Sequence, residues 1–283
     1  MKRIMTTSPS ESIQPQFAVI DGLNIRFAAS EDRDDHALLL NPWPESVFAF
    51  APTWSRLAER THLVAIDLPG FGHSERRDEL MSPRAMGEFL IRVADAFGLD
   101  HPHVVGPDVG TGSALFAAAL YPGRLRSLVV GSGGAAVPIQ LGGALRDWVE
   151  NPDIETFRHT DPRKIVAAAL GTIERYQIPE PIREDYLSGY DGDRFFESIR
   201  YVRGYPEQLP VLRDLLPRIQ TPVLNIAGDH DRAVPPANSE FLHQRLPHSK
   251  LEIIDSAHFT WEDAADEYAA LVTSWWSGGY RAV

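Results

Sequence analysis

The sequence predicts an α/β protein built around one mostly parallel β-sheet. Three observations lead to this fold class. Short apolar runs alternate with longer helical patterns along most of the chain, which favours parallel strands joined by helices. The alternation opens with an antiparallel hairpin. It is then interrupted by about 80 residues, 136–213, that contain no good strand.

The hairpin is predicted from two apolar runs, residues 16–20 and 23–28, which flank Asp21-Gly22. An Asp-Gly pair between two such runs is typical of a two-residue β-turn. Residues 37–40 form a further short strand that ends at a proline-rich loop. A helix follows at 53–60, and a buried strand at 62–66 ends at the sequence DLPGFGHS.

Strands and helices continue to alternate toward the C-terminus. A helix over 82–97 is predicted with Ser82 as its N-cap and Pro83 in its first position, where proline is well tolerated. The remaining strands are expected at 103–105, 125–130, 223–227 and 251–254, and the remaining helices at 111–121 and from 261 to about 276.

The strand-free stretch looks like a helical cap inserted into the sheet domain. It contains seven prolines, at 138, 152, 162, 179, 181, 206 and 210. We expect it to cover the carboxyl ends of the strands, where ligands bind in open α/β sheets. The predicted organisation is therefore a first part of the core at 1–135, a helical cap at 136–213, and a second part of the core at 214–283.

Composition excludes several classes of function. The chain has 283 residues, is 43% hydrophobic and has a formal net charge of −12. A nucleic-acid-binding protein normally has a basic surface that neutralises phosphates, so neither nucleic acids nor anionic membranes are expected partners. The absence of cysteine excludes disulfides, thiolate catalysis and cysteine-ligated zinc.

The N-terminal segment does not resemble a targeting peptide. Lys2 and Arg3 precede a polar Ser/Thr/Pro stretch, where a signal peptide would need an apolar run. The chain also has no run of about 18 apolar residues, the length that a membrane-spanning helix needs. We therefore expect a cytoplasmic protein without a membrane partner.

Residues 103–112 carry the strongest indication of chemistry. The pattern is a strand, then Gly106-x-Asp108-x-Gly110, then a helix. A turn this tight strains the central residue, and small residues on both sides let the strand and helix approach each other. Asp108 would lie at the positive end of the helix dipole, beside free backbone N–H groups.

Five motifs together resemble one protein family. They are PWPES at 42–46, DLPGFGHS at 67–74, GPDVG at 106–110, GDHD at 228–231 and SAHF at 256–259. In this order they resemble the α/β-hydrolase superfamily, and within it the branch of epoxide hydrolases and haloalkane dehalogenases that uses an aspartate nucleophile. The resemblance covers residues 18 to about 276 and implies an eight-stranded, mostly parallel sheet.

The resemblance implies a catalytic triad. Asp108 matches the nucleophile, Asp231 the acid that orients the histidine, and His258 the general base. Asp229 is a competitor for the acid, but the family's acid aligns with Asp231. The backbone N–H groups of Val109 and Trp43 would hold the developing oxyanion.

The identity of the nucleophile narrows the reaction. A carboxylate that attacked an ester or amide carbonyl would form an anhydride, an uphill product. Attack on an sp³ carbon with a strained or good leaving group forms an ordinary alkyl ester. Water activated by His258 can then hydrolyse that ester, which divides one hard step into two easier ones.

Two departures from the family pattern affect the oxyanion and leaving-group sites. Asn41 and Pro42 replace the usual His-Gly of the oxyanion loop. Val109 stands where haloalkane dehalogenases have a tryptophan that binds the halide, and Val109 cannot donate from its side chain. Trp43 stands where their second halide ligand would be.

Epoxide opening needs an acid that protonates the leaving alkoxide, and similar epoxide hydrolases use tyrosines of the cap. Among the tyrosines of this cap, Tyr201 and Tyr190 are the preferred catalytic candidates, and Tyr186 is a candidate for substrate binding. The cap tyrosines are Tyr176, Tyr186, Tyr190, Tyr201 and Tyr205.

The sequence thus predicts an epoxide hydrolase that acts on a small hydrophobic organic substrate, needs neither a cofactor nor a metal, and is a monomer or a homodimer. Three alternatives remain. The same triad could serve a hydrolytic dehalogenase. An altered oxyanion loop could leave a binding protein without catalysis. Esterase activity is disfavoured by the anhydride argument.

Overall fold

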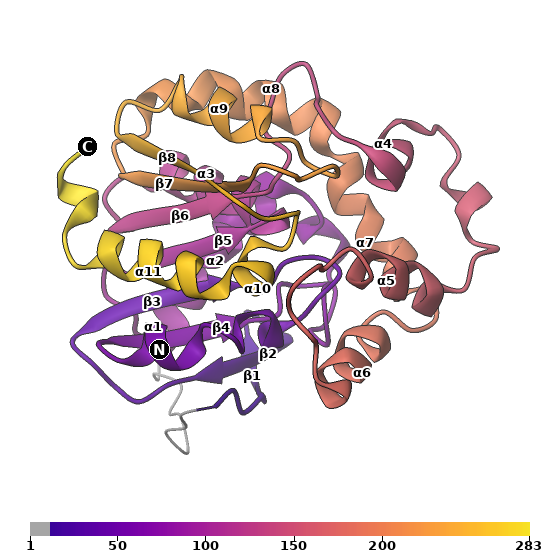
Figure 1. Cartoon of the computed structure of the whole chain (residues 1–283), viewed down its shortest axis with the longest axis horizontal. Helices are drawn as coiled ribbons and strands as arrows, with labels where there is room; N and C mark the ends of the chain where they lie inside the picture. The colour runs from indigo at the N-terminus through magenta and orange to yellow at the C-terminus, as the bar shows by residue number, and fades with distance from the viewer. Residues whose placement is uncertain (1–11) are drawn as a thin grey trace.

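A computed structural model describes residues 12–283 of the chain (Figure 1). The polar N-terminal segment discussed above lies largely outside the described residues. Eight strands form one sheet in the order β1-β2-β4-β3-β5-β6-β7-β8. The strands are β1 Gln16–Ile20, β2 Leu23–Ala29, β3 Asp35–Leu40, β4 Thr61–Ile66, β5 His103–Pro107, β6 Ser127–Gly131, β7 Val223–Gly228 and β8 Ser249–Ile254.

The pairing of the strands confirms the predicted fold class. The pairs β1–β2 and β2–β4 are antiparallel, and all other neighbours are parallel. Asp21 and Gly22 both have positive φ angles, 50° and 79°, as the tight hairpin turn between β1 and β2 requires. Because the later strands run parallel, their carboxyl ends meet at one edge of the sheet.

Helices cover both faces of the sheet (Figure 1). One apolar cluster contains side chains of α2, α3 and α9, and a second contains those of α1, α10 and α11 on the other face. These helices are α1 Trp54–Ala58, α2 Pro83–Phe97, α3 Val109–Leu120, α9 Ala237–His243, α10 Thr260–Asp263 and α11 Ala265–Trp276.

The ends of the helices show how local sequence sets their limits. Helix α2 begins as predicted, because Ser82 Oγ accepts a hydrogen bond from the backbone N–H of Ala85 (3.3 Å) and Pro83 follows it. The predicted single C-terminal helix was wrong. Ala264, with φ −123° and ψ 40°, leaves the helical region and separates α10 from α11.

Five α-helices lie between β6 and β7 in the chain, and we call this segment the cap. It projects to one side of the sheet in Figure 1. Its helices are α4 Gly143–Glu150, α5 Pro162–Leu170, α6 Glu180–Ser188, α7 Arg194–Arg203 and α8 Tyr205–Leu215.

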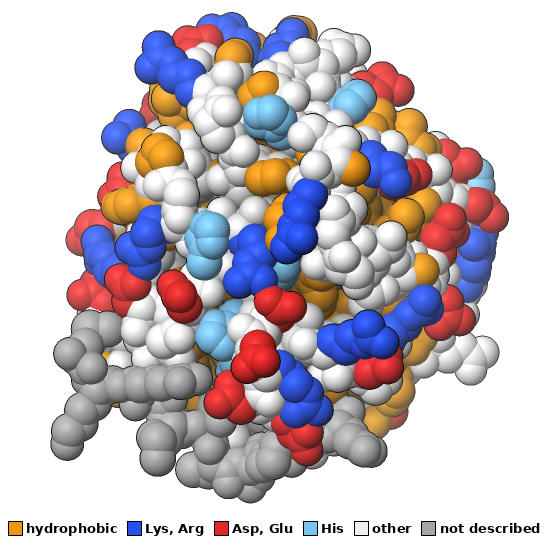
Figure 2. All heavy atoms as spheres, turned by 90° about the vertical axis from the view of Figure 1, so that its left-hand side faces the viewer, with side chains coloured by type: hydrophobic (Ala, Val, Ile, Leu, Met, Phe, Trp, Pro, Cys, Tyr) orange, Lys and Arg blue, Asp and Glu red, His pale blue; other side chains and the backbone are white. Residues whose placement is uncertain are grey.

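One face of the molecule carries charged side chains of both signs, interspersed among neutral ones and together with scattered hydrophobic ones (Figure 2). Within residues 12–283, none of the helices combines the length and the apolar composition that crossing a bilayer requires.

Candidate active site

The turn between β5 and α3 places Asp108 at the carboxyl edge of the sheet. Asp108 has φ 50° and ψ −121°, an unfavourable backbone conformation for a residue with a side chain. A Cβ atom on Gly106 would lie 2.8 Å from the carbonyl oxygen of Gly110. The strand and the helix therefore approach as closely as the two glycines allow, which is the geometry that the sequence predicts.

Backbone donors hold the carboxylate of Asp108. Its Oδ2 atom accepts a hydrogen bond of 2.7 Å from the backbone N–H of Trp43, and the carboxylate also accepts one from the backbone N–H of Val109. The N–H of Asp108 itself donates to the carbonyl oxygen of Gly131 (2.9 Å). The structure thus brings together the residues that the sequence named as nucleophile and oxyanion donors.

The side chain of Asn41 shapes the oxyanion loop. It is buried, and its Nδ2 atom donates to the carbonyl oxygens of Pro42 (3.0 Å) and Glu45 (3.1 Å). Its Oδ1 atom accepts from the N–H of Leu68 at 2.7 Å. The loop therefore keeps a defined form, and the N–H of Trp43 reaches Asp108 although Asn41-Pro42 replaces His-Gly.

His258 lies between two aspartates. Its Nδ1 atom is 2.8 Å from Oδ2 of Asp231, and its Nε2 atom is 3.8 Å from Oδ1 of Asp108. The other oxygen of Asp231 accepts from the N–H groups of Ala233 (2.9 Å) and Val234 (2.8 Å), which fixes its orientation. Asp231 is therefore placed to hold the imidazole with Nε2 directed toward the nucleophile.

Asp229, the competing acid, lies elsewhere. It accepts from the N–H of Ser256 (3.2 Å) and forms an exposed cluster with His230 and Asp255. The ligand atoms of these three residues are close enough to hold a metal ion. However, all three side chains are exposed and pair with one another, as on an ordinary solvated surface.

Within the triad, Asp108 and His258 form a buried ion pair. Burial raises the pKa of Asp108 to about 6, although the charge of His258 and the donors at Trp43 and Val109 oppose this effect. For His258, burial lowers the pKa. The charges of Asp231 and Asp108 outweigh that effect and raise the pKa to about 9. At neutral pH the free site therefore contains an ionised Asp108 and a protonated His258.

The hydroxyl groups of the three preferred tyrosines are already engaged. Tyr201 donates to the carbonyl oxygen of Val109 (2.7 Å) and lies 2.6 Å from Ser113 Oγ. Tyr190 donates to the carbonyl oxygen of Glu45 and accepts from the N–H of Gly72. These hydroxyls tie the cap to the core, and their protons point to backbone acceptors.

Tyr186 donates to Oε1 of Glu262 (3.0 Å). Tyr205 differs from all three, because among the described residues its hydroxyl has no hydrogen-bond partner. Burial, and next the charges of Tyr201 and Asp108, raise its pKa. Tyr205 is thus buried within the electrostatic reach of Asp108 and retains a free O–H. Sequence periodicity could not distinguish it from the other cap tyrosines.

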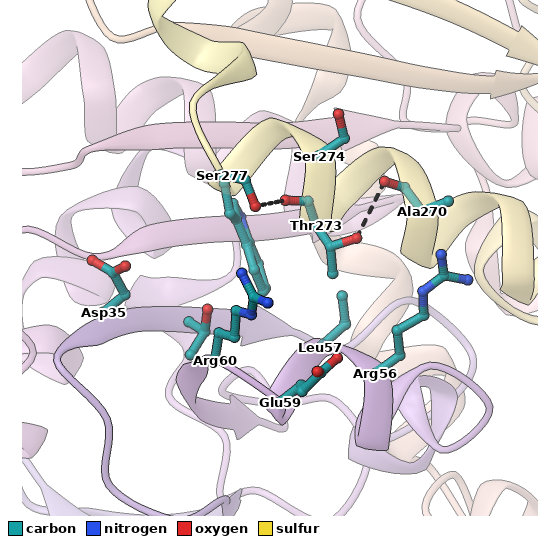
Figure 3. Close-up of a pocket in the computed structure, with 11 residues that line it drawn as sticks. Asp35, Arg56, Leu57, Glu59, Arg60, Ala270, Thr273, Ser274 and Ser277 are labelled. Atoms are coloured by element: carbon teal, nitrogen blue, oxygen red, sulfur yellow. Dashed lines mark hydrogen bonds between the residues drawn. The ribbon is translucent and has the colours of Figure 1, made fainter.

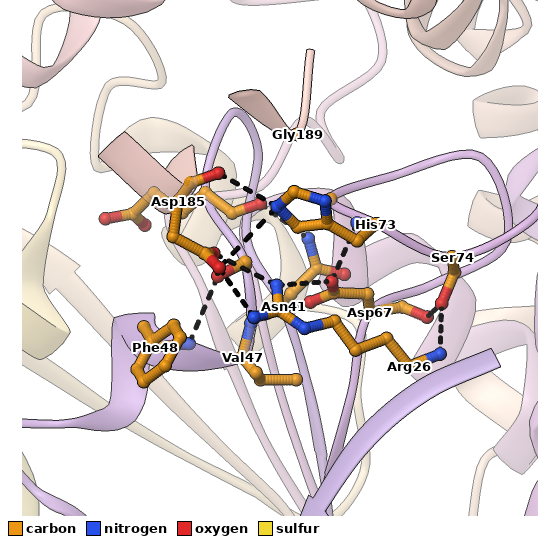
Figure 4. Close-up of polar contacts among 12 residues, drawn as sticks. Arg26, Asn41, Val47, Phe48, Asp67, His73, Ser74, Asp185 and Gly189 are labelled. Atoms are coloured by element: carbon orange, nitrogen blue, oxygen red, sulfur yellow. Dashed lines mark hydrogen bonds and ion pairs between the residues drawn. The ribbon is translucent and has the colours of Figure 1, made fainter. Parts of the chain in front are cut away.

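A polar network joins the cap to the loops around the site (Figure 4). Arg26 of β2 and Asp185 of α6 face each other and form a two-pronged ion pair. Asp185 also accepts from Ser46 Oγ (2.6 Å), next to the oxyanion loop. Asp67, from the DLPGFGHS motif, accepts from the N–H groups of Val47 (2.7 Å) and His73 (2.8 Å). The motif thus serves to organise the loops beneath the cap.

A surface cleft of about 570 Å³ lies away from this site, between α1 and α11 (Figure 3). Asp35 and Thr61, which line it, are the first residues of β3 and β4. The cleft is therefore at the amino edge of the sheet, opposite Asp108. Its lining is mostly polar and charged and contains no member of the triad.

Comparison with known proteins identifies the family. The alpha/beta hydrolase fold family matches residues 38–265, so the chain belongs to that family. A putative carbamate hydrolase RutD of Caulobacter sp. (strain K31) is 28% identical, over 93% of this chain and 98% of that protein. A pimeloyl-[acyl-carrier protein] methyl ester esterase of Neisseria meningitidis is 25% identical, over 86% of this chain and 93% of that one.

Solved structures agree on the fold. The epoxide hydrolase CorEH superimposes with a TM-score of 0.79 at 17% identity, over 94% of this chain and 99% of that one. At this level of identity the likeness concerns the fold alone. The chemistry of this chain has to be argued from its own site.

Proposed function

We propose that this protein is a hydrolase that opens an epoxide to a vicinal diol through an alkyl ester on Asp108. The observation that supports this most is the nature of the residue at the turn between β5 and α3. It is a carboxyl group with two backbone donors on it and a His–Asp pair beside it. No cofactor enters this chemistry.

In the first step, Oδ2 of Asp108 stays with the N–H of Trp43, and Oδ1 attacks one epoxide carbon. The C–O bond of the ring breaks, and the ring oxygen takes a proton from an acid of the cap. The products are an alkyl ester, a neutral hydroxyl group and the conjugate base of the cap acid, which now carries the negative charge that Asp108 has lost. Attack by a carboxylate at an sp³ carbon avoids the anhydride that ester substrates would produce.

The second step uses the change in charge that the first produces. The ester has no negative charge, so one of the two charges that raise the pKa of His258 disappears. His258 can then lose its proton, which balances the proton that the cap acid gave to the ring oxygen, and accept another from water. The hydroxide attacks the ester carbonyl, and the backbone N–H groups of Trp43 and Val109 stabilise the resulting oxyanion. Asp231 stabilises the imidazolium that forms. The intermediate then collapses with cleavage of the Cγ–Oδ1 bond, and the alkoxide takes the proton of the imidazolium and leaves as the diol. The new carboxyl group of Asp108 gives its proton to His258, which restores the starting charges.

We propose Tyr205 as the cap acid in place of Tyr201 and Tyr190, because its hydroxyl alone among these three is free to donate to a ligand. Tyr205→Phe is expected to slow epoxide opening about 100-fold or more, which is the usual contribution of a general acid. Alkylation by a haloalkane is expected to change little, because a halide leaves without a proton. Single-turnover rates with both substrate classes measure the difference.

Tyr190→Phe is the matched control, since the hydroxyl of Tyr190 is bonded to the backbone at Glu45 and Gly72. Tyr190→Phe should change the single-turnover rates of both substrate classes equally, and it should lower the stability of the protein. Equal rates for wild type and Tyr205→Phe on epoxides would remove Tyr205 from the mechanism. If haloalkanes release halide and no epoxide is converted to a diol, the dehalogenase alternative is favoured.

One observation favours the dehalogenase alternative. Trp43 Nε1 is buried and has no acceptor among the described residues. It lies among Trp148 and Phe195, which contact its ring. An indole N–H of this kind can bind a halide. Val109 supplies no second donor from its side chain, so we place epoxide opening first.

The names of the relatives suggest ester or carbamate hydrolysis as a further candidate function. Asp108 argues against a covalent route to such substrates, because the intermediate would be an anhydride. We therefore propose a small, largely hydrophobic epoxide as the substrate. The surroundings of Trp43 are aromatic, consistent with such a ligand.

A further inference from the structure

Two glutamates that the mechanism does not use are buried beside the active site. Glu45, in the loop after β3, is 0% exposed, and Glu262, in α10, is 2% exposed. Glu45 is two residues after Trp43, whose N–H binds Asp108, and Glu262 is four residues after His258. Glutamate is almost never buried to this extent without partners.

Each carboxyl group has one neutral donor. Trp261 Nε1 donates to Oε2 of Glu45 (2.9 Å), and the hydroxyl of Tyr186 donates to Oε1 of Glu262 (3.0 Å). The remaining oxygens, Oε1 of Glu45 and Oε2 of Glu262, are buried and receive no donor from the described residues. The two carboxyl groups are within hydrogen-bonding contact of each other.

Two ionised carboxylates in contact would offer acceptors only and would repel each other. A single proton between them supplies the missing donor and leaves one negative charge for the pair. We propose that Glu45 and Glu262 share one proton and act as positioning residues, which hold the oxyanion loop against the segment that carries His258. The shared proton does not depend on which reaction the protein catalyses, whereas the positioning role rests on the proposed function.

The electrostatic surroundings place this proton on Glu45. Burial, and next the charge of Glu262, raise the pKa of Glu45 well above its usual value, and its hydrogen bond to Glu262 raises it further. Burial raises the pKa of Glu262 to about 7, and the hydrogen bond with Glu45 opposes the rise. The other titratable groups facing the pair are Asp108, Asp263, Tyr176, Tyr186 and Tyr190.

The pair joins three parts of the molecule. Glu45 sets the loop whose N–H at Trp43 holds Asp108, and Glu262 and Trp261 belong to the segment after His258. The cap contributes Tyr186 to Glu262 and Tyr190 to the carbonyl oxygen of Glu45. A proton on Glu45 therefore helps to set the distance between the oxyanion donors and the base.

This arrangement gives stability a defined dependence on pH. The pKa of Glu45 is raised by folding, so its contribution to stability is complete below its unfolded value and is lost as the pH rises through the folded value. Glutamine at position 45 would keep one acceptor for Trp261 and one donor for Glu262, and it does not titrate.

The test compares the melting temperatures of wild type and Glu45→Gln from pH 5 to pH 10. We expect the two to be similar at pH 5. At alkaline pH, the melting temperature of the variant relative to that of wild type should rise by about 3 °C or more. A change of this size corresponds to roughly one pKa unit of coupling in a chain of this length. Glu79→Gln, at an exposed position, is the control and should show no such trend. Parallel curves for wild type and Glu45→Gln would overturn the shared proton.

A second measurement does not depend on the stability of the variant. Carbon-13 NMR of wild-type protein labelled at the glutamate carboxyl carbons should show one carboxyl group that is still protonated at neutral pH. The Glu262→Gln and Glu45→Gln variants assign it. If every glutamate of the wild type is ionised by about pH 6, more than a unit above the ordinary glutamate pKa, the proposal is wrong.

Activity tests the positioning role separately. With an epoxide substrate, kcat of wild type should fall at alkaline pH relative to kcat of Glu45→Gln, and KM should change little. If the pair titrates but this difference in kcat is absent, the pair is structural only and the positioning role is rejected. A titrating pair in a protein that opens no epoxide would reject the proposed substrate alone.

Discussion

Replacing Asp108 by alanine is expected to lower turnover of an epoxide about 10⁴-fold or more, as the loss of a covalent nucleophile does in other hydrolases. Without Asp108, His258 could activate water only for direct attack on the epoxide. That route lacks the ester intermediate and the donors at Trp43 and Val109 then have no oxyanion to stabilise. Diol formation under saturating substrate measures the effect.

A titration of His258 shows whether the variant keeps the site intact. The charge of Asp108 is one of two that raise the pKa of His258 to about 9, and Asp231 is the other. In Asp108→Ala the histidine pKa should therefore fall, measured by NMR of its ring. Turnover within about tenfold of wild type, together with this lower pKa, would mean that Asp108 is not the nucleophile.

Replacing Gly131 by alanine is expected to destabilise the protein by about 4 kcal/mol or more, the range of the most severe single substitutions. Gly131 ends β6 with a φ of 148°, and a Cβ atom there would lie 1.7 Å from the carbonyl oxygen of Ile226 in β7. Neither backbone can move without disturbing the sheet. Denaturant unfolding of wild type and variant measures the difference.

Gly123→Ala is the matched control. Gly123 also has a positive φ, 78°, but a Cβ atom there would meet nothing within 4 Å. Only the backbone strain remains, so a loss of about 1 kcal/mol is expected. Because the carbonyl oxygen of Gly131 accepts from the N–H of Asp108, any folded Gly131→Ala protein should also lose activity. Equal destabilisation by both changes would contradict the role of the contact with Ile226.

The framework of the fold could be predicted from the sequence because its elements have strong local signatures. The Asp21-Gly22 turn fixed the hairpin, and Ser82-Pro83 fixed the start of α2. The break at Ala264 could not be predicted, because the apolar pattern continues through it. Asp263, just before the break, accepts hydrogen bonds from the backbone N–H groups of Glu174 and Arg175, a long-range contact that helix propensity does not describe.

The site was predictable to the extent that its chemistry depends on spacing along the chain. Asp108, Asp231 and His258 lie next to strand ends and meet at one edge of the sheet. The role of the cap tyrosines depends on what each hydroxyl meets, which periodicity does not describe. Tyr201 and Tyr190 face backbone carbonyls, whereas Tyr205 has no such partner.

Glu45 and Glu262 show a further limit. Glu45 lies within the PWPES motif and Glu262 lies three residues after the SAHF motif, so most of the chain separates them. Their contact follows from the meeting of the loop after β3 with α10. The neighbours of the two residues in the sequence give no sign of the pair, since Glu45 is followed by Ser46 and Glu262 by Asp263.

The central claim, a covalent ester on Asp108, is tested most directly by the intact mass of His258→Gln incubated separately with epoxides and haloalkanes. Without the base, hydrolysis of the ester should stop while its formation continues. We expect a mass gain equal to the whole epoxide, located at Asp108 by peptide mapping and absent from the double variant Asp108→Ala/His258→Gln. A gain equal to a haloalkane minus its hydrogen halide would instead identify a dehalogenase. If wild type forms diol from an epoxide while His258→Gln gains no mass with it, the ester mechanism is contradicted.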